Sequence, residues 1–233
     1  MLILGIETAT DQVGCAIGGH EGVLALFEVT RGRRHAETLT PAIEFTCRTA
    51  EIDLDEISVV AVDIGPGLFT GLRVGIATAK AIAHALRVPM IGITSLDLLA
   101  FPLRHSSRMI VTVIDARRRE VFYAFYRQSP GGVQRISPPL VGSPDDLAGE
   151  LMSTAEEVVL VGDGALRYRD RLSEGQRGVE FAEQWLAHPS AAPLVQLAHA
   201  QALREEWVSP GALEPMYLRK PDAAINWSTR EHR

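Results

Sequence analysis

Short apolar runs alternate with helical patterns along the chain, which predicts an α/β fold. The three runs nearest the N-terminus are joined by short turns and predict an antiparallel meander. The predicted strands are residues 2–7, 13–18, 23–30, 59–64, 89–94, 109–115, 121–126 and 158–161. The predicted helices are residues 38–50, 71–86, 96–103, 144–152 and 193–207. We expect Thr40 to cap the first of these helices and Pro41 to lie in its first turn.

One pattern occurs twice, in residues 2–17 and again in residues 111–125. Each copy has an apolar strand, an acidic residue (Glu7 or Asp115), a short polar turn and a second strand. The repeat predicts two related α/β lobes, of which the second is the smaller. The predicted divisions are a first lobe at residues 1–104 that is completed by the 193–207 helix, a second lobe at 105–192, and a tail at 208–233.

A glycine-rich turn joins the 59–64 strand to the 71–86 helix. A strand end followed by a tight turn and a helix start exposes backbone amide donors, which suits an anion. However, the turn lacks the Gly-Lys-Ser/Thr ending of a phosphate loop, and its third glycine comes one residue late for a dinucleotide fingerprint. The alternative is a turn that lets the helix pack closely on the sheet. Spacing alone does not decide between the two.

Composition and charge limit the classes of function. Apolar residues make up 46% and charged residues 22%, as in an ordinary globular protein. The net charge of −6 argues against a protein that binds a polyanion unaided. We interpret two basic clusters, Arg31/Arg33/Arg34/His35 and Arg117–Arg119, as solvated loops. Two cysteines, and the lack of a membrane span or signal peptide pattern, give a cytoplasmic location as the expectation.

Five segments, in this order, resemble motifs of the TsaB (YeaZ) family. They are residues 4–10 (LGIETAT), 35–41 (HAETLTP), 65–75 (GPGLFTGLRVG, followed by Ala79-Lys80), 114–122 (IDARRREVF) and 215–219 (PMYLR). The third is the most specific. One departure is Glu7, because many relatives have Asp at that position. In ATP-using members of the fold an acid there, followed by a glycine, helps to hold metal and phosphate, and Glu7-Thr8-Ala9-Thr10 has no such glycine.

The resemblance implies an actin/Hsp70/sugar-kinase-like (ASKHA) fold and a non-catalytic role. Such proteins pair with a catalytic TsaD-like subunit and work with a TsaE-like ATPase. Their bacterial complex installs threonylcarbamoyl on N6 of the adenosine next to the anticodon of tRNA. The resemblance places the pairing on the two helices at 38–50 and 71–86, and tRNA would be reached only through the complex. Homodimer or monomer in the absence of the partner stays open.

Two sets of residues are candidates for sites. Gly71, Gly75, Ala79 and Ala83 recur every four positions and predict a smooth stripe that something approaches closely, either a partner or the protein's own sheet. The predicted partner-binding residues are His35, Leu39, Ile43, Cys47, Gly71, Val74, Gly75, Thr78, Ala79 and Ile82. The predicted remnant nucleotide or anion loop is Glu7, Thr8, Gly65, Gly67, Thr70, Gly71 and Arg73. Whether this loop binds anything stays open.

The sequence supplies no recognisable catalytic machinery. No two histidines are three, four or five residues apart, there is no Cys-x-x-Cys, and there is no Gly-x-Ser-x-Gly turn. We therefore predict no catalytic residue, no metal and no cofactor. The alternatives are an ATPase or phosphotransferase that depends on Glu7 and Asp115, and a glycoprotease-like peptidase. The peptidase would need a metal site or a nucleophile that this sequence does not show.

Overall fold

The first lobe is built on a five-stranded sheet. In the computed structural model, which describes residues 1–31 and 34–219, its strand order is β3-β2-β1-β4-β5. The strands are β1 (Leu2–Glu7), β2 (Gln12–Gly19), β3 (Gly22–Thr30), β4 (Ile57–Asp63) and β5 (Met90–Ile93). The first three are antiparallel, and β1, β4 and β5 are parallel. Arg33 of the first basic cluster and the tail residues 220–233 lie outside the described residues.

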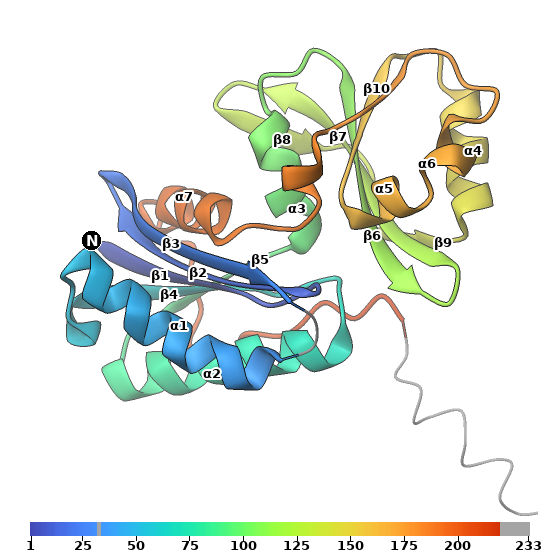
Figure 1. The fold of residues 1–233 in the computed structure, drawn as a ribbon. Helices are drawn as coiled ribbons and strands as arrows, with labels where there is room; N and C mark the ends of the chain where they lie inside the picture. The colour runs from blue at the N-terminus through green and yellow to red at the C-terminus, as the bar shows by residue number, and fades with distance from the viewer. Residues whose placement is uncertain (32–33, 220–233) are drawn as a thin grey trace, which may run out of the picture.

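Helices cover both faces of this first sheet (Figure 1). Alternation along β1 points Leu4 and Ile6 toward α1 (His35–Ala50) and α2 (Phe69–Leu86). Ile3 packs on the other face, against Leu194 of α7 (Ala191–Ala202). The long parallel helices therefore lie on one side of the sheet and the late helix on the other.

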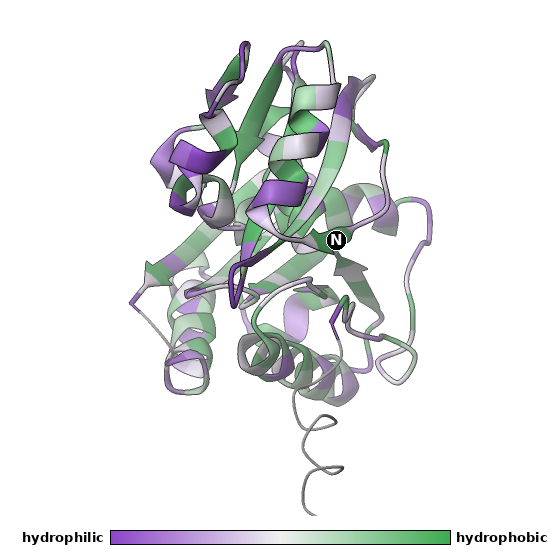
Figure 2. Cartoon of the chain, turned by 90° about the vertical axis from the view of Figure 1, so that its right-hand side faces the viewer, coloured by the Kyte–Doolittle hydropathy of each residue, from purple (hydrophilic) through white to green (hydrophobic). Residues whose placement is uncertain are grey.

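The second lobe repeats this topology. Its order β11-β10-β6-β7-β8 corresponds strand for strand to β5-β4-β1-β2-β3, with β9 added beside β7. The strands are β6 (Met109–Arg117), β7 (Glu120–Ser129), β8 (Gly132–Arg135), β9 (Leu140–Gly142), β10 (Val158–Val161) and β11 (Val179–Phe181). The two matching mixed sheets confirm the predicted fold class of two related α/β lobes. Figure 2 shows the strands of both sheets coloured mostly as hydrophobic.

Helices also cover the second sheet. Leu147 of α4 (Pro144–Ser153), Ala165 of α5 (Asp163–Arg167) and Leu172 of α6 (Arg169–Ser173) pack on the same face as Val111 and Val113. The opposite face of the sheet packs on α3, which spans Ser95–Ala100. Short 3₁₀ turns occur at Leu54–Glu56, Phe101–Leu103 and Gln184–Leu186. Among the residues that the structure describes, no helix is long and apolar enough to cross a membrane.

Two of the helix boundaries that differ from the predictions have a clear structural cause. Helix α1 begins at His35, three residues early, so Pro41 lies inside the helix and Thr40 does not cap it. The reason is tertiary: His35 is buried, and its Nε2 donates to Thr10 O at 2.7 Å. Helix α7 ends at Ala202, because the chain then turns through Glu205, whose φ is 58°. The sequence pattern did not predict β8, β9, β11, α5 or α6.

Residues 208–219, which we name the C-terminal strap, link the two lobes. Val208 forms a two-way backbone pair with Met90 at 2.9 Å, beside the edge strand β5. Further along, Met216 N donates to Ile64 O at 2.7 Å. The strap then reaches the second lobe, where Arg219 donates to Glu120 at 2.9 Å. A segment with no periodic pattern is thus held by backbone hydrogen bonds and one ion pair.

Candidate functional site: the outer face of two helices and the junction of the lobes

The glycine stripe of α2 faces the protein's own sheet. A Cβ atom on Gly71 would overlap the Thr8 carbonyl oxygen, and one on Gly75 would overlap the Thr8 hydroxyl oxygen. Ala79 is fully buried in the first core. The expectation that Gly71, Gly75 and Ala79 form an exposed partner stripe is therefore wrong, and close packing on the sheet explains both glycines.

The predicted residues of α1 are buried too. His35, Leu39, Ile43 and Cys47 all lie on the inner side of the helix. They form hydrogen bonds or apolar contacts within the chain and are not free for a partner. Of the predicted partner-binding set, only Val74, Thr78 and Ile82 of α2 are half-buried and partly accessible.

The solvent side of α2 is unusually poor in charge. Between Arg73 and His84 the helix carries a single charged residue, Lys80. Its exposed positions there are alanines, where surface helices normally carry polar side chains. We define the outer helix face as the accessible residues Val74, Ala77, Thr78, Ala81, Ile82 and Ala85 of α2, with the exposed Pro41 of the adjacent α1. Phe45 of α1 is 49% exposed, but its ring packs on Phe27 of the edge strand β3, with the ring centroids 6.1 Å apart, on the side of α1 away from α2.

Two buried carboxyls lie where β1 and β4 end. These strands are parallel neighbours, so Glu7 and Asp63 reach the same edge of the sheet. Glu7 accepts from Ala9 N at 2.7 Å, while Asp63 accepts from Gly65 N and Ser95 Oγ, both at 2.7 Å. Their second oxygens have no hydrogen-bond partner among the described residues.

Burial controls the charge of this pair. It raises the pKa of Asp63 to about 7. For Glu7, burial and then the proximity of Asp63 raise the pKa well above its usual range. Two adjacent carboxyls in a dry site do not both ionise readily, so the pair retains a proton at neutral pH. Sequence reasoning selected Glu7 but missed Asp63, although Glu7 ends one predicted apolar strand and Asp63 is the last but one residue of another.

The glycine turn is folded against the chain and not open to an anion. Leu68 N donates to Ala9 O at 2.7 Å, and a Cβ on Gly67 would overlap Ala9. Thus the structure brings Glu7, Thr8, Gly65, Gly67 and Gly71 of the predicted loop together in tight packing. Thr70 and Arg73 instead lie on the surface.

An arginine joins the lobes. Arg117 pairs with Asp11 of the first lobe at 2.5 Å and with Asp115 of its own lobe at 3.0 Å. Arg167 approaches the same Asp115 at 3.5 Å. Asp163 accepts from Asp115 N at 3.0 Å, and burial raises the pKa of Asp163. Asp11 and Asp163 were not predicted, because only the fold brings them to Arg117 and Asp115.

The arginine turn has an unusual backbone. Arg117, Arg118 and Arg119 have φ values of 63°, 55° and 62°. Left-handed backbone is uncommon for residues with a Cβ, and here three such residues follow one another. Within the described residues, no group of three or more His, Cys, Asp and Glu is arranged to hold a metal ion.

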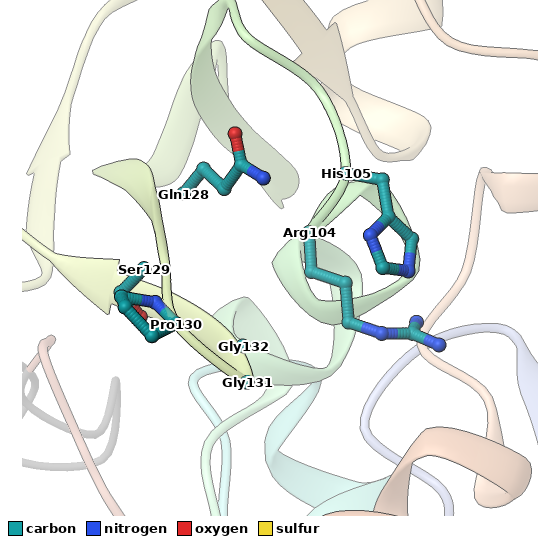
Figure 3. Close-up of a pocket in the computed structure, with 7 residues that line it drawn as sticks. All are labelled: Arg104, His105, Gln128, Ser129, Pro130, Gly131 and Gly132. Carbon is teal, nitrogen blue, oxygen red and sulfur yellow. The ribbon is translucent and has the colours of Figure 1, made fainter.

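A cavity of about 410 Å³ lies in the second lobe, between residues 104–105 and the β7–β8 hairpin (Figure 3). Gln128 and Ser129 of the hairpin lie across from Arg104 and His105. The Arg104 guanidinium already donates to Phe101 O at 3.2 Å. None of the seven lining residues is buried, so the cavity contains no desolvated polar group and we assign it no function.

Comparison with known proteins adds family relationships to this geometry. The family model of TsaD, described as tRNA N6-adenosine threonylcarbamoyltransferase, matches residues 29–227. An uncharacterized protein of Mycobacterium leprae is 38% identical over 95% of the chain, which spans 56% of that relative's length. The tRNA threonylcarbamoyladenosine biosynthesis protein TsaB of Escherichia coli is 29% identical, over 94% of this chain and 95% of its own. The solved structure of YeaZ from Pseudomonas aeruginosa superposes with a TM-score of 0.82 at 26% identity, covering 93% of this chain and 99% of that one.

Proposed function

The chain belongs to the TsaB (YeaZ) family, and on that premise we propose that it is the non-catalytic subunit of the bacterial complex that installs threonylcarbamoyl on tRNA. The modified atom is N6 of the adenosine next to the anticodon. In this proposal the protein binds a TsaD-like catalytic subunit, works with a TsaE-like ATPase and reaches tRNA through the complex. Relatives of matching length carry the TsaB name, which favours the TsaB role over the transferase named by the family model.

The observation that carries the proposal is the outer helix face. Small apolar residues on a solvent-exposed helix lose nothing by being covered, and they let another helix approach closely. The half-buried Val74 and Ile82 add the larger apolar side chains that interfaces commonly contain. The face therefore suits a partner that presents its own helices, as a related two-lobed subunit would.

The junction of the lobes supports a role without catalysis. Arg117 forms ion pairs with Asp11 and Asp115, and in the glycine turn the Leu68 amide already donates to Ala9 O. A phosphoryl-transfer site needs free donors and cations around the phosphates. This arrangement favours a subunit that supports the catalyst over the alternative of an ATPase.

The test introduces a charge on the face without touching the core. Ala81 is exposed on α2, and Ala81→Arg should weaken binding of the TsaD-like subunit of the same organism by about tenfold or more, equivalent to about 1.4 kcal/mol. Ala200→Arg is the matched control, because Ala200 is an exposed alanine of α7 on the opposite side of the sheet. Isothermal titration calorimetry measures both. Equal affinity of Ala81→Arg and wild type would overturn the proposed face.

The same face predicts what the protein does alone. We propose that without its partner the protein self-associates through the outer helix face, since two copies would cover each other's apolar residues. Light scattering of wild type and Ala81→Arg at matched concentration tests this. A wild-type monomer, or a dimer that Ala81→Arg leaves intact, would contradict the proposed self-association. Binding to the TsaD-like subunit is tested separately by the calorimetry described above.

A further inference from the structure

An exposed stack of three planar groups lies at the N-terminal end of α2. The guanidinium carbon of Arg73 is 3.9 Å from the centroid of the Phe69 ring. The Tyr217 ring of the strap lies at 5.5 Å from Phe69, tilted by 41°. Phe69 is 39% exposed and Tyr217 is 42% exposed, so a substantial part of both rings faces water.

The fold holds both sides of this stack in place. Phe69 and Arg73 are one helical turn apart on α2, which puts their side chains on one face. Tyr217 sits between two fixed points of the strap, the Met216 N to Ile64 O bond and the Arg219 contacts to Ala116 O and Glu120. The stack is therefore a preformed surface and not a chance collision of mobile side chains.

Several arginines lie where the strap passes from the stack to the second lobe. Arg219 places the strap directly beside the Arg117–Arg119 turn, because its contacts are Ala116 and Glu120, the residues that flank this turn. Arg117 and Arg219 are neutralised by Asp11, Asp115 and Glu120. In contrast, Arg73 and Arg119 form no ion pair with any residue that the structure describes. The uncompensated guanidinium group of Arg73 thus lies on the Phe69 ring, and that of Arg119 belongs to the turn that the strap reaches through Arg219, in a protein whose net charge is −6.

We propose that this stack, with Arg119, is a contact site for an unpaired nucleotide of the tRNA substrate, an inference that rests on the proposed function. Aromatic rings bind bases by stacking, and neighbouring cations bind the phosphates. One such position in an acidic protein gives weak binding by the isolated chain and a supporting contact in the complex. The competing explanation is that the rings only fasten the strap to α2, which predicts an effect on stability and none on RNA.

The experiment measures RNA binding by the isolated chain. The probe is a fluorescent RNA hairpin with the loop of an unmodified tRNA anticodon arm, and the comparison is a blunt duplex of its stem. We expect wild type to bind the hairpin with a dissociation constant of about 10⁻⁴–10⁻⁶ M at low salt and to bind the duplex more weakly. Tyr217→Leu and Arg73→Gln should each weaken hairpin binding by about 5- to 100-fold, the equivalent of one lost stacking contact.

Matched variants separate RNA contact from folding and from pairing. Tyr217→Phe keeps the ring and should retain binding. Arg48→Gln removes an exposed arginine that lies 5.8 Å from the Phe45 ring, a similar pair on α1, and should have no effect on RNA. Unchanged hairpin binding by folded Tyr217→Leu, or equal binding of hairpin and duplex, overturns the proposal. If Tyr217→Leu no longer binds the TsaD-like subunit in calorimetry, the stack belongs to the protein interface and the RNA proposal is also overturned. A failure of the proposed function itself would instead be seen in the Ala81→Arg test.

Discussion

The backbone of Gly75 lies so close to Thr8 that a Cβ atom at position 75 would overlap the Thr8 hydroxyl oxygen. The same hydroxyl donates to Gly71 O at 2.9 Å, so Thr8 connects two turns of α2 to the end of β1. These contacts fix the distance between helix and sheet. The two glycines are therefore a requirement of the fold of one chain, and the proposed partner surface lies on the other side of the helix.

This contact predicts that Gly75→Ala destabilises the monomer. Helix propensity alone would favour alanine by about 1 kcal/mol, but the overlap with Thr8 should outweigh it and lower the free energy of unfolding by about 1–3 kcal/mol. Urea denaturation measures the change. Gly149→Ala is the control, because Gly149 is an exposed residue of α4 with open space around it, and its replacement should stabilise by about 0.5–1 kcal/mol.

A double-mutant cycle identifies the cause. In Thr8→Ala the hydroxyl is gone, so Gly75→Ala should cost much less in that background, with a coupling energy of at least about 0.5 kcal/mol. If Gly75→Ala proves as stable as wild type, or if its cost is the same with and without the Thr8 hydroxyl, close packing is not the reason for this glycine.

The buried carboxyl pair predicts a stability that falls as pH rises. Folding raises the pKa of Asp63 from 3.8 to about 7, so the folded chain binds more protons than the unfolded chain between these values. The contribution of Asp63 is complete below pH 4 and is lost as pH rises through 7, at about 1.4 kcal/mol per pH unit. Asp63→Asn stays neutral and can still accept the Ser95 and Gly65 hydrogen bonds.

Urea denaturation from pH 5 to pH 8 compares the two proteins. Wild type should lose stability relative to Asp63→Asn across this range, and Asp63→Asn should be the more stable of the two at pH 8. Asp146→Asn is the control, since hydrogen bonds from Ser143 lower the pKa of Asp146 and its titration lies outside this range. Parallel pH profiles for wild type and Asp63→Asn would show that Asp63 titrates normally.

The strand pattern was predictable from the sequence because helices cover both faces of each sheet, so the central strands are continuous apolar runs. The β1 and β10 boundaries, for example, match the predictions residue for residue. The direction of the α2 stripe was not predictable, since a smooth helix surface fits a sheet as well as it fits another helix. Thr8 decides this question, and its proximity to Gly71 and Gly75 arises only in the folded chain.

The contacts at the junction of the lobes could not be predicted from the sequence for a related reason. Asp11 and Arg117 are 106 residues apart, and no local spacing relates them. The turn at Arg117–Arg119 adopts left-handed backbone without a glycine, so the usual turn composition is absent. The strap is held by backbone hydrogen bonds at Met90 and Ile64, which leave no pattern of side chains. The resemblance to a family supplied the proposed function where local physical patterns could not.

The strained turn predicts a variant that gains stability and loses RNA binding. Arg119 has a φ of 62°, which costs an L-residue about 1 kcal/mol that glycine does not pay. Arg119→Gly should therefore raise the free energy of unfolding by up to about 1 kcal/mol while it weakens binding of the RNA hairpin. Arg87→Gly removes the same charge at a φ of 58° at the end of α2, so it should show a similar gain with unchanged RNA binding. Equal RNA binding by the two variants would remove Arg119 from the proposed contact.

The last prediction sets the partner subunit against an ATPase of the same fold. Any nucleotide between the lobes would meet Asp11, Asp115 and Asp163, whose charges are only partly balanced by Arg117 and Arg167. A triphosphate also needs free amide donors and cations around its phosphates, but Arg117 is held by Asp11 and Asp115 and the Leu68 amide donates to Ala9 O. We therefore expect Mg·ATP to leave the free energy of unfolding unchanged and the purified protein to release no phosphate.

Binding would be easy to detect, because a ligand at one hundred times its dissociation constant adds about 2.7 kcal/mol to the free energy of unfolding. Thermal and urea denaturation with and without millimolar Mg·ATP provide the measurement, and Mg²⁺ with inorganic sulfate controls for ionic strength. Glu7→Gln and Asp115→Asn extend the test to the two acids on which an ATPase would depend. Stabilisation or turnover by wild type that disappears in both variants would favour the ATPase. If the protein is the proposed supporting subunit, Mg·ATP should leave the free energy of unfolding of all three proteins unchanged. Both variants should still bind the TsaD-like subunit, because neither acid lies on the outer helix face.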